Sequence, residues 1–163
     1  MSFAVGDTDM YPSTALHFGN VYSMLFTFFF LFLPMNLANA AKIARLLRRH
    51  RLAALYAVGF YAIFMATFRI DHPYNTEAWA QWFVSNQILG FFQQSPVHRT
   101  LFFLPVLWSV LSLLCVRLYA REYYLIYPLS IAFLLPLWHV DPRYFLVPFV
   151  LFLLFKEEDP RSV

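Results

Sequence analysis

The sequence is poor in charged residues and in cysteine. Asp, Glu, Lys and Arg make up 13% of its 163 residues, about half of the share found in soluble domains. Its single cysteine, Cys115, cannot form an internal disulfide, and no Cys-x-x-Cys pair is present. The chain also lacks a basic face interleaved with aromatic residues, and its first cation is Lys42. These absences argue against a soluble domain, a nucleic-acid partner and an N-terminal secretory signal.

Apolar side chains dominate the sequence instead. Hydrophobic residues make up 61% of the chain and aromatic residues 21%, and the mean hydropathy is +0.58. A soluble core of this size could not bury so much apolar surface, so the surplus has to face lipid. The composition therefore predicts an integral membrane protein.

The apolar residues are gathered in long segments. A membrane-spanning helix needs roughly 17–25 mostly apolar residues. Five segments are interpreted as spans, of which the last is short: residues 16–38, 52–68, 101–116, 123–138 and 144–155. Residues 69–100 mix Trp and Phe with polar residues, which predicts a helix lying in the membrane interface. The expected fold is therefore a single all-α membrane domain over residues 1–163, with about five transmembrane helices and an interfacial helix.

The cations are unevenly distributed between the loops. Nine of the twelve Lys and Arg residues lie in residues 42–51, residues 117–121 and the tail from residue 156. Cytoplasmic loops carry an excess of these residues. We therefore expect a multi-pass protein with a non-cytoplasmic N-terminus and a cytoplasmic C-terminus, in the endoplasmic reticulum or a bacterial inner membrane. A non-cytoplasmic N-terminus without a signal sequence would be natural if this chain were the second half of a longer protein.

The outer side of this topology collects ionisable residues near the predicted span ends. They are Asp7, Asp9, His17, Arg69, Asp71, His72, His139, Asp141 and Arg143. Such groups near a membrane are costly unless they are paired or functional. Arginine binds phosphate through paired donors, and a carboxylate or histidine can move a proton. The combination suits a phosphate-linked substrate.

Each of these residues also has a simpler structural explanation. Asp141 and Arg143 could form a local pair that caps a helix start. Asp7 could belong to a solvated segment, His17 could cap or pack at the start of the first span, and His72 could be an ordinary loop histidine. Both sets of readings stay open at this point.

Metal and lipid sites leave only weak traces in the sequence. No HExxH motif or other tight ligand spacing is present, and the Asp7–Asp9 pair is the one acidic pattern typical of Mg²⁺ or Mn²⁺ sites. A divalent metal is therefore not expected. The basic segment 42–51 is interpreted as the topology determinant, with contact to anionic lipids as a secondary role.

Three short elements occur together in a fixed order. A GD pair, an LH dipeptide and an aromatic span ending in proline occupy Gly6, Asp7, Leu16, His17 and Pro34. An HPY-like piece follows at residues 72–74. An RYF-x-x-P element then occupies Arg143, Tyr144, Phe145 and Pro148. In these elements the chain resembles the C-terminal half of the endoplasmic-reticulum α-1,2-glucosyltransferases, which are polytopic GT-C-like enzymes dependent on dolichyl-phosphate-glucose.

The resemblance implies a GT-C-like fold and an inverting transfer of glucose from a polyprenyl-phosphate donor to a lipid-linked oligosaccharide. That chemistry takes place on the luminal side, in agreement with the orientation expected from charge. The chain departs from the family at two points. After the HPY-like piece the family has another polar, aromatic stretch, whereas this chain has NTEAWAQWFVSNQ. GT-C enzymes usually place the catalytic acid in the first outer loop, and that loop has no counterpart here. The chain is therefore expected to hold part of a site.

Two functions from different classes follow. The first is a glycosyltransferase module in which Asp7 and His17 are catalytic, with Asp7 orienting a sugar hydroxyl or assisting proton transfer. The residues assigned to substrate binding are Arg143, which would bind the donor phosphate, Asp141, His72 and Arg69. The expected partners are membrane lipid, the lipid-linked sugar donor and a second polytopic subunit that completes the site.

The alternative is a non-catalytic structural subunit of a membrane protein complex. A small transporter or channel is less favoured, because few ionisable residues lie in the middle of the predicted spans.

Overall fold

The computed structural model describes residues 16–50, 52–77 and 83–157. Within these ranges the regular structure is helical, apart from one isolated antiparallel bridge between Leu118 and Lys156. This confirms the all-helical part of the predicted fold class.

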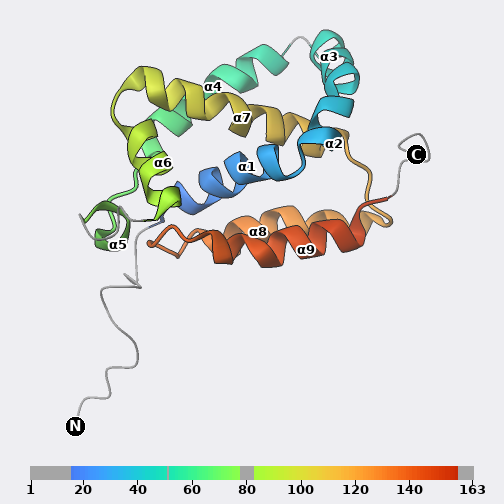
Figure 1. Cartoon of the computed structure of the whole chain (residues 1–163). Helices are drawn as coiled ribbons and strands as arrows, with labels where there is room; N and C mark the ends of the chain where they lie inside the picture. Colours follow the sequence, from blue (N-terminus) through green and yellow to red (C-terminus); the bar gives the residue numbers. More distant parts are fainter. Residues whose placement is uncertain (1–15, 51, 78–82, 158–163) are drawn as a thin grey trace.

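The helices follow one another closely along the chain (Figure 1). They are α1 (Gly19–Leu31), α2 (Leu33–Ala38), α3 (Ala40–Arg49), α4 (Ala53–Thr67), α5 (Pro73–Thr76), α6 (Val84–Gln93), α7 (Pro96–Cys115), the 3₁₀ helix η2 (Arg121–Leu125), α8 (Ile126–Leu134), the 3₁₀ helix η3 (Pro142–Phe145) and α9 (Leu146–Phe155). Four of the five ranges interpreted as spans contain at least one of these helices. The range 101–116 only overlaps α7, which begins at Pro96, inside the segment predicted to lie in the interface.

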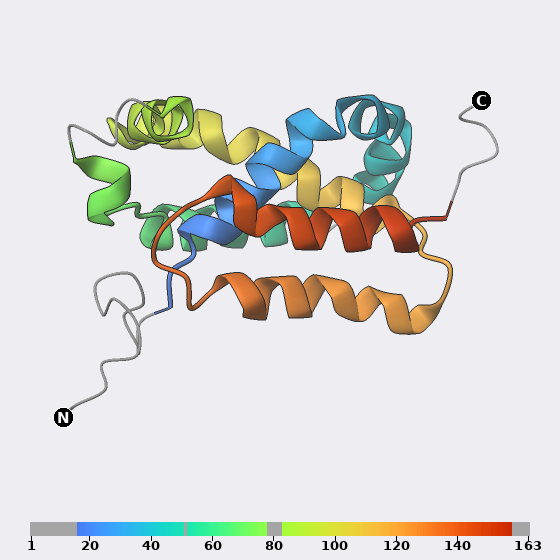
Figure 2. The same cartoon turned by 60° about the horizontal axis from the view of Figure 1, so that its bottom comes forward.

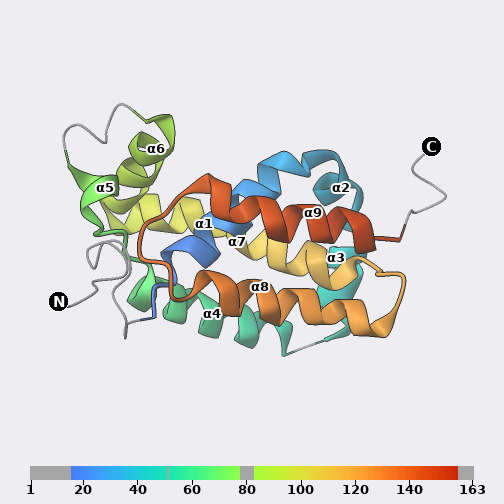
Figure 3. The same cartoon turned by 90° about the horizontal axis from the view of Figure 1, so that it is seen from below.

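Helix α1 lies in the middle of the molecule, between two pairs of helices. Helices α4 and α7 lie on one side of it, and α8 and α9 form a hairpin on the other (Figure 1). Figures 2 and 3 show α8 and α9 side by side along their length. The helix pair α4–α7, helix α1 and the α8–α9 hairpin thus form three layers. The segments that connect the helices lie at the two opposite ends of this bundle.

The contact between α1 and α7 combines an aromatic stack with a polar link. The Phe26 and Phe102 rings are parallel, with centroids 4.3 Å apart. The Ser109 hydroxyl donates to the Leu25 carbonyl at 2.8 Å. Ser109 is fully buried, and small polar residues of this kind let helix backbones approach closely. Phe68 stacks on the other face of Phe102, with centroids 4.7 Å apart, and so extends the aromatic core to the end of α4.

A short break separates α1 from α2. Pro34 sits in the first turn of α2 and has no backbone donor. The buried Asn36 side chain donates to the Phe28 and Phe29 carbonyls, at 3.3 and 3.0 Å, so it satisfies groups near the break. Trp108 of α7 donates to the Asn36 carbonyl at 3.0 Å and fixes the turned segment against α7.

Within the described residues, one helix is long and apolar enough to cross a membrane: α7, with 20 residues and a mean hydropathy of 1.6. Shorter apolar helices cover Gly19–Leu31, Leu55–Thr67 and Pro142–Phe155. The number of spans therefore stays a prediction.

Many large apolar side chains lie on the outer surfaces of the helices. Examples from four helices are Leu55 at 66% exposed, Leu104 at 56%, Leu129 at 65% and Leu153 at 56%. An apolar exterior of this extent is not typical of a soluble monomer, so these faces are expected to contact lipid or another chain.

If the aromatic core stabilises the fold, two substitutions on α7 should differ strongly in their effect on the free energy of unfolding. Phe102→Ala removes a fully buried ring that stacks on Phe26 and Phe68, and it should lower the free energy of unfolding of the detergent-solubilised protein by about 3 kcal/mol. Leu104→Ala, at a side chain 56% exposed, is the matched control and should cost much less. Equal losses would show that the aromatic core does not stabilise the fold.

Candidate functional site

One end of the bundle collects the start of α1, the segment after α4, α5, α6 and the connection between α8 and α9 (Figures 1 and 3). Asn20, fully buried on the first turn of α1, donates to the Leu137 and His139 carbonyls at 2.8 and 2.9 Å. The backbone of His17 donates to the Leu135 carbonyl at 2.8 Å. These bonds hold the α8–α9 connection against the start of α1.

A second buried asparagine ties α5 to the same connection. Asn75 donates to the Val140 carbonyl at 2.9 Å and accepts from the Val140 amide at 3.0 Å. It also donates to the side-chain oxygen of Asn86 at 2.9 Å, and Asn86 donates to the Tyr74 carbonyl at 3.1 Å. Hydrogen bonds from side-chain amides therefore hold the segments at this end of the molecule in position.

Gly19 lets the chain segments approach each other closely. A Cβ atom at this position would lie 3.0 Å from the Arg69 carbonyl oxygen and 3.3 Å from a methyl group of Val140. The start of α1, the segment after α4 and the α8–α9 connection therefore meet at a point where a larger residue does not fit without a shift.

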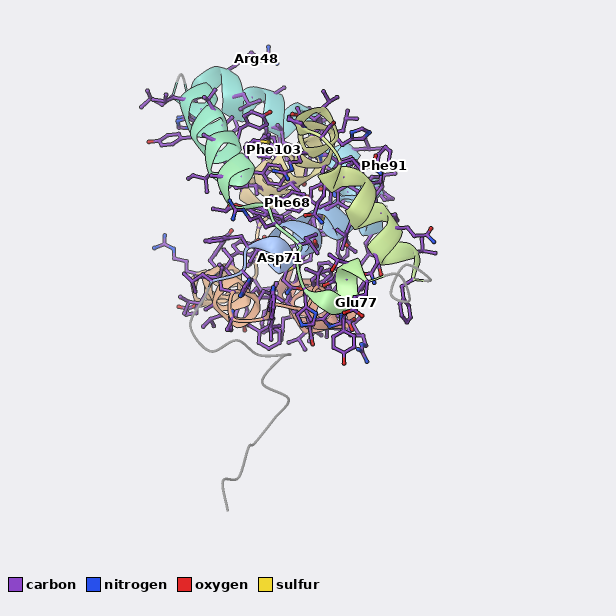
Figure 4. All side chains as sticks on the ribbon, turned by 90° about the vertical axis from the view of Figure 1, so that its left-hand side faces the viewer. Arg48, Phe68, Asp71, Glu77, Phe91 and Phe103 are labelled. Atoms are coloured by element: carbon purple, nitrogen blue, oxygen red, sulfur yellow. The ribbon has the colours of Figure 1, made fainter. Side chains whose placement is uncertain are left out.

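Trp138 is the centre of a cluster of rings at this end. Its ring stacks with His17 at a centroid distance of 5.7 Å and meets the edge of His72 at 4.6 Å. Its indole nitrogen donates to the Asp71 carboxylate at 2.8 Å. The ring centroids of His139 and His72 lie 5.2 Å apart. Figure 4 looks onto this end and places Asp71 near the α8–α9 hairpin, with Phe68 farther from the hairpin in the aromatic core.

Two of the predicted site histidines differ in their bonding. His72 is buried, and its Nδ1 atom accepts from the Tyr74 amide at 3.1 Å, as in an ordered loop. His17 is half-buried, and its Nε2 atom is shielded from solvent and has no hydrogen-bond partner among the described residues. A buried polar atom left without a partner is costly. His17 Nε2 is therefore the ring atom of this cluster that is best placed to bond an added group.

Arg143 and Asp141 form an ion pair at the start of η3. The Asp141 carboxylate accepts from the Arg143 backbone amide at 2.9 Å and from Nε at 2.8 Å, with a further contact to Nη2. The predicted capping pair is therefore present. The Asp141 side chain is only 11% exposed, whereas that of Arg143 is 79% exposed. The carboxylate thus anchors a guanidinium whose remaining donors face outward.

The electrostatics of this turn favour a fixed charge distribution. Burial raises the pKa of Asp141, but the hydrogen bonds and charge of Arg143 outweigh it, so the net shift is downward. The hydrogen bond that the Arg143 guanidinium donates to Asp141 raises the pKa of Arg143. Burial lowers the pKa of His139, opposed by Asp141 and reinforced by His72 and Arg143. The turn therefore holds an anion and a cation beside a histidine that resists protonation.

Three residues of the predicted outer-face set remain: Arg69, Asp7 and Asp9. Arg69 is exposed at the same end, and its side chain makes no hydrogen bond or ion pair with the described part of the chain. Asp7 and Asp9 lie outside the described residues. Among residues 16–50, 52–77 and 83–157, no group of three or more His, Cys, Asp or Glu side chains is placed to hold a metal ion.

Sequence reasoning did not identify Asn20, Asn75 or Trp138 as parts of this site. The available signal was weak: a polar amide just inside an apolar segment, and a Trp beside a histidine. A scan of protein-family models, curated proteins and solved structures finds no match to this chain.

A pair of glycine substitutions tests the close approach at this end. Gly19→Ala should lower the free energy of unfolding by about 1–3 kcal/mol, because the atom nearest to the added methyl group, at 3.0 Å, is a backbone carbonyl oxygen. Gly59→Ala is the control, since a Cβ atom there meets nothing within 4 Å, and in the middle of α4 it should add about 0.5–1 kcal/mol. Equal effects of the two would contradict the tight contact.

The lowered pKa of His139 predicts a pH dependence of stability. A histidine with a depressed folded-state pKa contributes stability above its ordinary value, near 6.5, that is lost as the pH falls through the folded value. Thermal unfolding should therefore show stability falling below about pH 6.5. His139→Gln should flatten this fall, whereas His50→Gln at the opposite end should leave it in place. An unchanged profile in His139→Gln would assign the dependence to other groups.

Proposed function

We propose that this chain is a membrane glycosyltransferase module. It transfers a sugar, glucose by resemblance, from a polyprenyl-phosphate donor to a lipid-linked or surface glycan acceptor on the non-cytoplasmic side, and it acts together with further polypeptide. The observation that carries the proposal is the anchored and outward-facing guanidinium of Arg143, next to a cluster of histidine and tryptophan rings at one end of an apolar bundle.

The arrangement suits recognition of a sugar joined to phosphate. A guanidinium presents paired donors that match phosphate oxygens, and one that is held by a carboxylate loses less freedom on binding. Trp138 is half-buried and can offer an apolar ring face with a fixed polar edge. Phosphate and sugar groups would then be recognised by neighbouring side chains of a single turn.

The transfer step needs a proton acceptor and a stabilised leaving group. The acceptor hydroxyl oxygen attacks the anomeric carbon, the bond from that carbon to the phosphate oxygen breaks, and phosphate leaves with the electron pair. The hydroxyl proton passes to a base, for which His17 Nε2 and Asp7 are the candidates. The fixed charge of Arg143 would stabilise the negative charge that develops on the phosphate.

A membrane location with five spans is part of the same proposal. It is supported by the exposed apolar side chains of α4, α7, α8 and α9 and by the position of the cations. The connections at the end opposite Arg143 carry the basic residues of α3, Arg117, Arg121 and Lys156. That distribution fits a cytoplasmic side at this end and a non-cytoplasmic side at the other.

A second candidate is a non-catalytic subunit of a membrane complex. One observation favours it: the bonds between Asp141 and Arg143 would by themselves explain both residues as the start of η3. In this case the exposed apolar faces contact partner chains, and the Arg143 side chain is dispensable once the turn has formed.

Substitution of Arg143 distinguishes the two candidates. In membranes that retain any companion subunit, Arg143→Ala should lower sugar transfer from polyprenyl-phosphate-glucose about a hundredfold, because a charge that stabilises the transition state is lost. Arg143→Lys should restore part of the activity, since a point charge lacks the paired donors.

The matched control is Arg121→Ala, which removes an exposed arginine at the opposite end. It should leave transfer unchanged, and membrane insertion of all variants is checked in parallel. Full transfer by inserted Arg143→Ala would remove this residue from the site and favour the structural subunit.

A further inference from the structure

The end of the bundle opposite Arg143 contains a hollow with a volume of about 2030 Å³. Its lining residues come from α2, α3, the end of α7 and the start of the chain segments that follow α7 and α9. These elements lie together at one end of the bundle (Figure 1). We call it the basic hollow; its lining residues are Pro34, Met35, Ala38, Asn39, Lys42, Arg45, Leu46, Arg48, Arg49, His50, Leu114, Cys115, Val116, Arg117, Lys156 and Glu157.

Among the described residues that line the basic hollow, most of the charged side chains are positive. Six of its lining residues are Lys or Arg and one, Glu157, is acidic. They come from three separate parts of the chain: α3, the segment after α7 and the segment after α9. Cations brought together from distant segments create a potential that favours a ligand with more than one negative charge.

The position of α3 is fixed by contacts with the bundle. Ile43 is buried at 3% exposure, and Asn39, just before α3, donates to Ser112 of α7 at 2.9 Å. The Nε atoms of Arg45 and Arg48 each donate to a carbonyl one turn earlier in α3, at 3.3 Å. The basic hollow is therefore a built surface, and the terminal nitrogens of these two arginines make no hydrogen bond or ion pair within residues 16–50, 52–77 and 83–157.

Part of the lining of the basic hollow is apolar. Pro34 and Met35 of α2 and Leu114 and Val116 at the end of α7 line it. Leu114 is 69% exposed, so the wall continues onto the apolar outer surface of α7. A lipid has a phosphate-bearing headgroup next to hydrocarbon chains, so it matches a cationic surface that adjoins an apolar one. A soluble phosphate would contact only the cations.

We propose that the basic hollow binds the headgroup of an anionic phospholipid, with its phosphate groups against Arg117, Lys156 and the cations of α3, and its acyl chains along α7. This site is separate from the candidate transfer site and lies at the other end of the helices. It rests on a membrane location and not on glycosyl transfer. Basic residues next to a membrane bind anionic lipids of the cytoplasmic leaflet in this way.

Lipid binding to the purified full chain tests the proposal. The protein in mild detergent is titrated with phosphatidylinositol phosphate and with phosphatidylcholine of the same acyl chains, and retained lipid is counted by native mass spectrometry. The wild-type protein should retain the anionic lipid in preference, and added salt should weaken this preference because exposed charges are screened.

Two arginines on the same connection provide a matched pair. Arg117 lines the basic hollow and Arg121 does not. Arg117→Gln should weaken binding of the anionic lipid about fivefold, as expected for one cation near an anionic surface, and Arg117→Gln with Lys156→Gln about twenty- to thirtyfold. Arg121→Gln should bind as the wild type does. These variants leave α3 intact, so membrane orientation is not disturbed.

Several outcomes would overturn the lipid assignment. Equal retention of phosphatidylcholine, or equal losses in Arg117→Gln and Arg121→Gln, would show that the basic hollow does not select the headgroup. Competition by inositol phosphate without acyl chains at the same concentration as the lipid would assign the site to a soluble phosphate. Loss of a co-purifying acidic protein in the double variant would assign it to a protein partner. Sugar transfer is measured separately, so a failed transfer assay leaves this result intact.

Discussion

The contact between α1 and α7 is the interaction on which the other parts of the structure depend. The stacked Phe26 and Phe102 rings and the bond from Ser109 to the α1 backbone set the distance between the two helices. Helix α4 then packs on α7, and the α8–α9 hairpin packs on α1. Because α1 runs between both ends of the bundle, it carries His17 and Asn20 toward one end and leads through α2 to the basic residues of α3 at the other (Figure 1).

The asparagines explain how an apolar bundle can hold two polar ends in defined positions. Asn20 and Asn75 bond to the α8–α9 connection, and the Asn39 side chain donates to Ser112 of α7. The Asn36 side chain donates to an α1 carbonyl, and its own backbone carbonyl accepts from Trp108 of α7. In a membrane, a side-chain amide nitrogen that donates to a backbone carbonyl of another segment satisfies both of these groups. The same bonds bring Trp138 against His17 and leave the Arg143 guanidinium at the surface, as the proposed phosphate site requires.

Local sequence features predicted the helical class, because long apolar segments with few charges leave little else that satisfies the backbone. A capping pair was one of the two readings left open for Asp141 and Arg143, and that pair is seen at η3. The cluster around Trp138 could not be predicted, because it joins segments near residues 17, 72 and 138 through long-range contacts. Apolar length also did not predict the break between α1 and α2, where Pro34 and Asn36 combine.

The central claim is that the two ends of the bundle lie on opposite sides of a membrane, and cysteine labelling tests it most directly. Replacing the single cysteine by Cys115→Ser leaves a background for two labelling positions. Glu77→Cys, just after α5 (Figure 4), marks the Arg143 end, and Glu122→Cys, in η2, marks the end of the basic hollow. Sealed, oriented membrane vesicles are then treated with a membrane-impermeant maleimide. The account predicts that one position reacts in intact vesicles and the other only after permeabilisation. Reaction of both positions in intact vesicles, or of neither until permeabilisation, would place both ends on one side and contradict it.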